Sequence, residues 1–162
     1  ISARRVNFRD MKKGTTEMLR FLATLVMLVL PSVAFSQTEA EVEALLCTDM
    51  ETSYRIPVGS VSYLEADCVS DTHAIEIDWN DKWREGVGQA LVYSKLLDLK
   101  FGLILVCKEN STKEHLCYRH SLSAQQVLSD IEVEGTIWQC VASAQSLDEC
   151  TRIEVTPSAV AQ

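Results

Sequence analysis

Three carboxylates on two neighbouring predicted strands are the residues best suited to chemistry. Asp67 lies in segment 61–69, and Glu76 and Asp78 lie in segment 74–79, where they alternate with isoleucines. Because side chains alternate along a strand, Glu76 and Asp78 should point to one face. A tight hairpin between the two segments would bring Asp67 close to Glu76. Clustered carboxylates are hard oxygen ligands, so this arrangement predicts a site for Mg²⁺, Mn²⁺ or Ca²⁺.

Two further polar residues belong to the helix that is predicted next, over about 82–97. Asn80 or Asp81 can cap this helix, since both types accept hydrogen bonds from exposed backbone N–H groups. Lys82 and Gln89 are seven residues apart and therefore share a helix face. We expect these two side chains to stand over the acidic cluster.

Hydrophobic periodicity predicts the elements that position these residues. A first helix over 38–50 begins at Thr38, with Glu41 three residues on as the second half of a capping box. The other predicted elements are strands at 52–56, 61–69, 74–79, 101–107 and 134–141, a helix at 113–128 and an edge strand at 150–155. The continuous apolar run 101–107 is typical of a strand covered on both faces. This order predicts an α/β fold with a mixed sheet.

The stretch DCVSDTHAIEIDW (67–79), continued by KWREGVGQALVY (82–93), resembles a small bacterial and phage exported group in the PD-(D/E)XK nuclease-like superfamily. The resemblance covers about residues 51–106. It implies a restriction-endonuclease-like core, in which a helix, a three-stranded meander, a helix and a strand follow one another. The element order predicted from periodicity agrees with that core.

The resemblance also implies roles for individual residues. It makes Asp67 and Glu76 ligands of Mg²⁺ or Mn²⁺, and it makes Gln89 the polar residue of the following helix. An acidic residue of the first helix is a further ligand in such enzymes, and Glu43 and Glu51 are the candidates here.

One position departs from the family pattern. Such enzymes carry a Lys two residues after the strand Glu, where it positions or activates water, but this sequence has Asp78 there. Three alternatives follow. Lys82 takes over the role of that Lys, Asp78 adds a third carboxylate to the metal site, or the domain has lost catalysis and keeps only the scaffold.

Two classes of function remain open. The first is an exported nuclease-like enzyme that hydrolyses phosphodiesters of nucleic acid with a bound metal. The second is a catalytically degenerate, disulfide-stabilised binding domain whose partner is a protein or an envelope component. Residues 37–162 hold 9 basic and 21 acidic side chains, a net charge of −12 that repels polyanions. An enzyme should therefore show a basic rim around Asp67 and Glu76.

The first part of the chain predicts export. Residues 1–10 read as untranslated upstream sequence, and residues 11–36 have the basic start, the apolar run and the small-residue cleavage pattern of a signal peptide. The apolar run, 21–30, is shorter than the roughly 20 residues that a bilayer requires, so we expect no stable membrane anchor. Residues 37–155 should form one domain, followed by a flexible tail at 156–162.

Six cysteines support the same compartment. They are Cys47, Cys68, Cys107, Cys117, Cys140 and Cys150, and all follow the predicted signal. An even number in a short exported chain predicts three disulfides, although six cysteines allow 15 pairings. Because no Cys-x-x-Cys pair occurs, the spacing does not favour a cysteine-bound metal. We expect a periplasmic or secreted protein.

Overall fold

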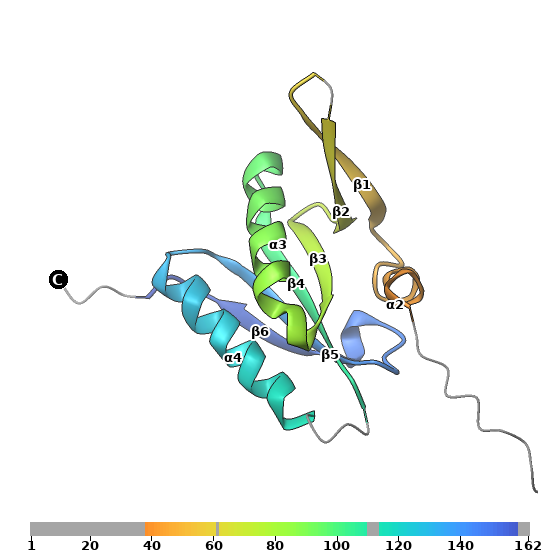
Figure 1. Ribbon diagram of the computed structural model, residues 1–162, viewed down its shortest axis with the longest axis vertical. Coiled ribbons are helices and arrows are strands. Elements are labelled where there is room, and N and C mark those ends of the chain that lie inside the picture. Colours follow the sequence, from red (N-terminus) through yellow and green to blue (C-terminus); the bar gives the residue numbers. More distant parts are fainter. Residues whose placement is uncertain (1–37, 61, 110–113, 159–162) are drawn as a thin grey trace, which may run out of the picture. The chain divides into compact units, whose positions relative to one another are not determined.

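A mixed sheet of six strands forms the centre of the protein (Figure 1). The computed structural model describes residues 38–60, 62–109 and 114–158. The strands are β1 (Glu51–Val58), β2 (Ser62–Val69), β3 (His73–Trp79), β4 (Lys100–Cys107), β5 (Gly135–Val141) and β6 (Thr151–Val155). They lie side by side in chain order. The predicted upstream residues and signal peptide lie outside the described residues.

The type of strand pairing changes twice across the sheet, from antiparallel to parallel and back. β1, β2 and β3 are antiparallel neighbours, β3, β4 and β5 run parallel, and β6 returns antiparallel to β5. The two parallel pairs are possible because a helix crosses over between their strands, α3 (Trp83–Leu97) and then α4 (Glu114–Asp130). The predicted α/β fold with a mixed sheet is therefore confirmed.

The two faces of the sheet bury different sets of residues. α3 and α4 cover one face, where they pack on alternate residues of β4 such as Leu103 and Leu105 (Figure 1). The other face buries Ile104 and Val106 together with residues of the short helix α2 (Glu39–Leu46). Nearly all of β4 is buried, which confirms that the apolar run 101–107 is a strand covered on both sides.

The ends of the first two helices differ in how well sequence predicted them. Thr38 and Glu41 form the predicted capping box, but α2 ends at Leu46, not near residue 50. The predicted cap of α3 is wrong. Asn80 and Asp81 belong to a 3₁₀ turn (Asn80–Lys82), and α3 starts at Trp83 with no side-chain cap.

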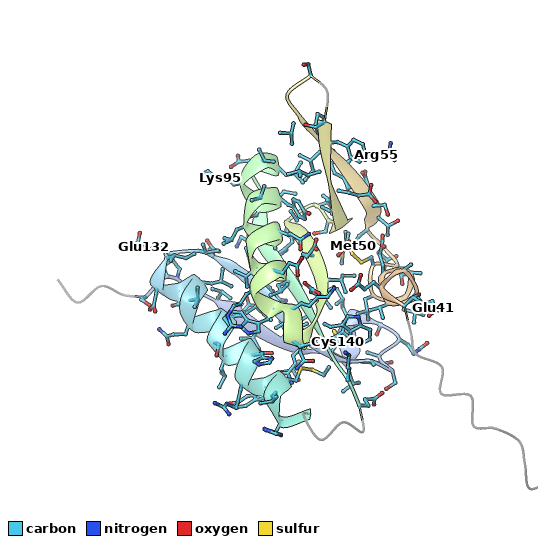
Figure 2. All side chains as sticks on the ribbon, viewed as in Figure 1. Glu41, Met50, Arg55, Lys95, Glu132 and Cys140 are labelled. Atoms are coloured by element: carbon cyan, nitrogen blue, oxygen red, sulfur yellow. A yellow bond between two sulfur atoms is a disulfide. The ribbon has the colours of Figure 1, made fainter. Side chains whose placement is uncertain are left out.

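Three disulfides connect the elements, as the cysteine count predicted. Cys47–Cys68 joins the end of α2 to β2, Cys107–Cys117 joins β4 to α4, and Cys140–Cys150 joins β5 to the residue before β6. Cys140 is labelled in Figure 2. Three disulfides fit an oxidising environment outside the cytoplasm. In the described ranges, no helix has the length and apolarity needed to cross a bilayer.

The predicted tail begins in contact with α4. The backbone N–H of Ser158 donates to the carbonyl of Ser129, and the hydroxyl of Ser129 donates to the carbonyl of Thr156. Residues 159–162 lie outside the described part of the chain.

Candidate metal centre

Asp67 sits where β2 and β3 separate. Backbone pairing between these strands is confined to Cys68↔Ile75 and Val69↔Ala74. At the next position Asp67 comes opposite Glu76, and there the side chain of Asp67, not the backbone of β2, provides the hydrogen-bond acceptor for β3. The Oδ2 atom of Asp67 accepts a hydrogen bond from the backbone N–H of Ile77 at 2.7 Å. This bond satisfies a strand N–H and fixes the Asp67 carboxylate beside β3.

Asp67 and Glu76 form an acidic pair between the sheet and α3. Their carboxyl groups lie within hydrogen-bond reach of each other, a contact that requires a shared proton because two carboxylates are both acceptors. Only 7% of Glu76 is exposed, and its Oε2 atom is buried without a hydrogen-bond partner among the described residues. The predicted convergence of these two side chains is what the structure shows.

The electrostatics of the acidic pair are unfavourable without a cation. Burial, followed by the charges of Asp67 and Asp78, raises the pKa of Glu76 to about 9. Burial also raises the pKa of Asp67 to about 6, against the bond from Ile77, which lowers it. At neutral pH the pair therefore retains a proton that ordinary carboxyl groups would lose.

Two residues of α3 face the acidic pair. Gln89 is half-buried and hydrogen-bonds the phenol of Tyr93, one helical turn further on. Tyr93 is 4% exposed, and burial and the charge of Glu76 raise its pKa. The structure thus places Gln89 on the side of the helix where it was predicted.

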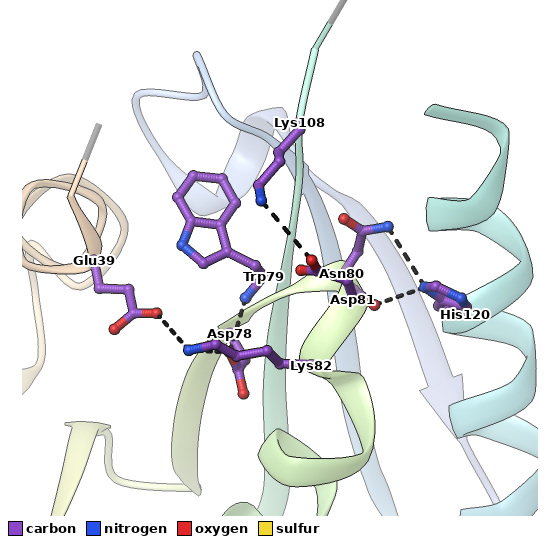
Figure 3. A network of polar contacts seen from close by, with 8 residues as sticks. All are labelled: Glu39, Asp78, Trp79, Asn80, Asp81, Lys82, Lys108 and His120. Carbon is purple, nitrogen blue, oxygen red and sulfur yellow. Dashed lines mark hydrogen bonds and ion pairs between the residues drawn. The ribbon is translucent and has the colours of Figure 1, made fainter. Parts of the chain in front are cut away.

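Of the three carboxylates in the predicted acidic cluster, Lys82 contacts Asp78. It lies in the 3₁₀ turn before α3, where its Nζ atom is 3.8 Å from Asp78 Oδ1 and 3.4 Å from Glu39 Oε1 (Figure 3). Asp78 is buried, and it also accepts a hydrogen bond from the backbone N–H of Trp79 at 3.0 Å. Burial raises the pKa of Asp78 to about 6, and Lys82 is the strongest influence that lowers it.

Two acidic residues of α2, Glu43 and Glu39, act on the carboxylates of the sheet, and of the two predicted candidates Glu43 belongs to this helix. Glu51 is an exposed residue of β1, so it is no helix residue at all. Glu43 is on α2 and raises the pKa of Asp67, but its carboxylate accepts bonds from the backbone N–H and the hydroxyl of Ser53. Glu39 raises the pKa values of Asp67, Glu76 and Asp78. It is the α2 residue with the broadest influence on the cluster.

A second group of polar contacts lies on the other side of the 3₁₀ turn (Figure 3). The Nδ1 atom of His120 lies 2.6 Å from the carbonyl oxygen of Asn80, and Lys108 lies 3.9 Å from Asp81. These contacts use the residues that were predicted to cap α3. The contact from His120 holds the turn against α4, and the contact from Lys108 links the turn to the residue after β4, so both position the end of β3 and do not add to the acidic pair.

Among the described residues, the charges that act most strongly on the acidic pair do not form the basic rim that was expected of an enzyme. The charged groups with the largest effects on its pKa values are acidic, namely Glu39, Glu43, Glu65 and Asp78. Within residues 38–60, 62–109 and 114–158, no group of three or more His, Cys, Asp or Glu side chains is arranged to hold a metal ion. The acidic pair can offer two carboxylates to a cation, and the cation would neutralise a strongly negative site.

Comparison of this chain with known families, proteins and structures found no match. No family model, no curated protein and no solved structure matches this chain.

Sequence reasoning missed two residues of the site. Tyr93 was not singled out, although a polar side chain four residues after Gln89 on a helix must lie beside it. Glu39 was passed over because it is in the first turn of a helix, where an acidic residue is ordinary. The sequence assigned Glu41 to the capping box, but it gave no sign that Glu39 reaches Lys82, since that depends on the packing of α2.

Proposed function

We propose that this chain is an exported, nuclease-like domain in which Asp67 and Glu76 bind Mg²⁺ or Mn²⁺ for phosphodiester hydrolysis. The observation that carries the proposal is the buried Oε2 atom of Glu76, which has no partner among the described residues while it lies beside a second carboxyl. A buried polar atom without a partner is costly and needs an explanation. A divalent cation explains it, because both carboxylates can then be ionised together.

The donor set fits Mg²⁺ or Mn²⁺ better than it fits a closed protein cage. Mg²⁺ commonly takes one or two carboxylates from the protein and completes its octahedral shell with waters and substrate phosphates. Two carboxylates, with no third clustered ligand among the described residues, match that pattern. When bound, such an ion supplies a Lewis acid for the phosphoryl oxygen and lowers the pKa of a bound water.

The residues around the pair have supporting tasks. Ile77 N–H holds Asp67 in place, and the bond between Gln89 and Tyr93 fixes two polar groups of α3. Lys82 is the cation that stands in for the family Lys. Its long side chain is half exposed and bound to Asp78 and Glu39, from which it could turn to a water near the acidic pair.

The order of the sheet supports the resemblance to the restriction-endonuclease-like core. An antiparallel meander of β1, β2 and β3, followed by a helix and a parallel β4, is the order which that resemblance implies. The three disulfides support a periplasmic or secreted location.

A second candidate function is a metal-binding domain that has lost cleavage and binds a protein or envelope component. Two observations favour it. Asp78 occupies the place of the family Lys, and the groups that surround the pair are acidic, which opposes the approach of a polyanion.

Metal-dependent stability tests the site. Mg²⁺ or Mn²⁺ at a hundred times its Kd should stabilise the oxidised wild-type protein by about 2.7 kcal/mol, because a ligand stabilises the state that binds it. Asp67→Ala and Glu76→Ala should abolish the rise in melting temperature. Asp71→Ala, which removes an exposed carboxylate from the turn before β3, is the matched control and should retain it. Equal metal responses in all four proteins would remove the site.

Cleavage assays separate the two candidates. Oxidised protein is incubated with single- and double-stranded DNA and RNA in Mn²⁺, and metal binding is measured on the same samples. Under the first function, Lys82→Ala lowers cleavage more than metal affinity, while Lys108→Ala changes neither. Metal binding without cleavage of any of these substrates would select the second function.

A further inference from the structure

A pocket of about 400 Å³ lies where β4 and β5 end, beside the first turns of α4. Its lining includes Glu109, His115, Tyr118, Gln139 and Val141, and it shares no residue with the acidic pair. Pockets of roughly 300 to 1,000 Å³ that combine apolar walls with a few polar groups are typical of binding sites. The volume and the lining of this pocket therefore fit a bound group.

Gln139 gives the pocket a hydrogen-bond acceptor that lacks a donor. Alternation along β5 places Gln139 on the same face as Ile137, which packs against α4. The Oε1 atom of Gln139 is buried and has no hydrogen-bond partner among the described residues. A buried carbonyl oxygen without a donor destabilises the folded chain. The pocket therefore favours a ligand that donates hydrogen bonds.

The charged groups of the lining favour a cationic donor. The carboxylate of Glu109 accepts bonds from the backbone N–H and the hydroxyl of Ser143, at 3.1 and 2.9 Å, and both of these donors are neutral. Lys108 also lines the pocket, but its Nζ atom lies 3.9 Å from Asp81 and 5.3 Å from the centre of the Trp79 ring (Figure 3). The charge of Lys108 is thus paired at the turn, whereas a cation in the pocket meets the charge of Glu109.

An exposed aromatic ring at the pocket also suits a cation. Tyr118 is 60% exposed on α4. The face of an aromatic ring attracts cations, and the planar, weakly hydrated guanidinium of arginine can stack on it while it donates several hydrogen bonds. Residues 37–162 also carry a net charge of −12, which attracts basic partners over a distance. The ring, the acceptor and the net charge all favour an arginine side chain.

We propose that this pocket receives an arginine side chain of a basic partner protein. The guanidinium donates to Gln139 Oε1, lies near the carboxylate of Glu109 and stacks on Tyr118. Because the pocket and the acidic pair have no residue in common, the partner binds whether or not the acidic pair holds a metal.

The test is an NMR titration of the oxidised protein, in the presence of a chelator, with a blocked Gly-Gly-Arg-Gly-Gly peptide. The peptide should shift the side-chain signals of Gln139 and Tyr118 in a saturable way. The same peptide with citrulline, a neutral isostere of arginine, should bind about tenfold more weakly. Equal binding of the two peptides, or no saturable shift, would overturn the proposal. Tighter binding of methylguanidinium than of the arginine peptide would overturn the assignment to a protein partner.

Two surface variants test the charge of the pocket. Val141 and Val127 are both 43% exposed, but Val141 lines the pocket and Val127 does not. Val141→Lys should weaken binding of the arginine peptide about tenfold or more, because like charges brought together repel. Val127→Lys adds the same charge elsewhere and should leave the affinity unchanged. Equal affinities in the two variants would contradict the site.

Gln139→Leu tests the acceptor itself. Because it replaces a buried oxygen that has no donor by apolar atoms, the peptide-free variant should be at least as stable as wild type in urea unfolding. It should bind the arginine peptide about tenfold more weakly, whereas Gln126→Leu, on an exposed part of α4, should keep wild-type affinity. Wild-type affinity in Gln139→Leu would overturn the role of Gln139. If Gln139→Leu does not fold, the comparison of the two lysine variants decides.

Discussion

Glu76 and Asp78 are two residues apart on β3 and face the same helix, yet their surroundings differ. Asp78 has Lys82 within 3.8 Å and a backbone N–H bond from Trp79. Glu76 has a second carboxyl beside it and an oxygen without a partner in the described chain. Correspondingly, the pKa of Asp78 rises to about 6 and that of Glu76 to about 9.

The difference between the surroundings of Asp78 and Glu76 shows which of the two buried carboxylates is stabilised by groups of the fold itself. A buried carboxylate that has a cation and a backbone donor is compatible with a folded chain on its own. One that faces another carboxylate destabilises the folded state unless it keeps a proton or receives a cation. Asp78 therefore belongs to the structure of the turn, whereas Glu76 must keep a proton or receive a cation.

The largest expected effect comes from separating α3 from β3. A Cβ at Gly86 would lie 2.9 Å from Leu103 Cδ1 and 3.1 Å from Asp78 Cβ, so Gly86→Val should destabilise the protein by about 3 kcal/mol in denaturant unfolding. Gly88→Ala is the control, because nothing lies within 4 Å of its Cβ position and Ala is the better helix former. A Gly86→Val protein as stable as wild type would show that the helix does not hold Asp78 in place.

The next effect is the pH dependence of stability without metal. The pKa of Glu76 is about 9 in the folded state against 4.5 for the free residue, so the folded chain keeps a proton that the unfolded chain loses between these values. Stability should therefore fall as pH rises from 5 to 8, by about 2 kcal/mol after allowance for solvent screening.

Glu76→Gln checks the origin of that slope. It should flatten most of the pH dependence and make the metal-free protein more stable than wild type at pH 8, in urea unfolding measured in the presence of a chelator. A wild-type profile that does not fall between pH 5 and 8 would contradict the assignment of an uncompensated charge to Glu76.

A smaller effect is expected at the compensated carboxylate. Asp78→Asn keeps an acceptor for the N–H of Trp79 and leaves Lys82 with Glu39, so stability at pH 7 should change by less than about 1 kcal/mol. The pH slope assigned to Glu76 should remain. If Asp78→Asn stabilises the metal-free protein as much as Glu76→Gln does, the distinction between the two residues is lost.

The smallest expected effect is a change in the pKa of a single group, Asp78. Lys82→Met removes the strongest influence that lowers the pKa of Asp78, so that pKa should rise above its wild-type value in NMR titration of the carboxyl carbon. Lys108→Met is the control, since Lys108 pairs with Asp81 and not with Asp78. Identical Asp78 titrations in the two variants would separate Lys82 from this carboxylate.

Local patterns in the sequence predicted the order of helices and strands and the positions of Asp67, Glu76 and Asp78. Alternation along β3 placed Glu76 and Asp78 on the face opposite to Ile75 and Ile77, because strand periodicity requires it. The short connection between β2 and β3 brought Asp67 opposite Glu76. The capping box at Thr38 was readable because it involves residues three apart in one helix turn.

Contacts between distant segments could not be read in the same way. The sequence left 15 cysteine pairings open, and the choice of Cys47–Cys68 depends on where α2 packs. Lys82 was assigned to the helix, but the turn before α3 directs it to Asp78 and Glu39. The sequence by itself thus determined the order and type of the elements and the alternation of faces along β3, since these follow from local backbone geometry. Only the tertiary structure decided that Glu39 reaches Lys82, because that depends on how a short helix packs against a segment far away in the chain.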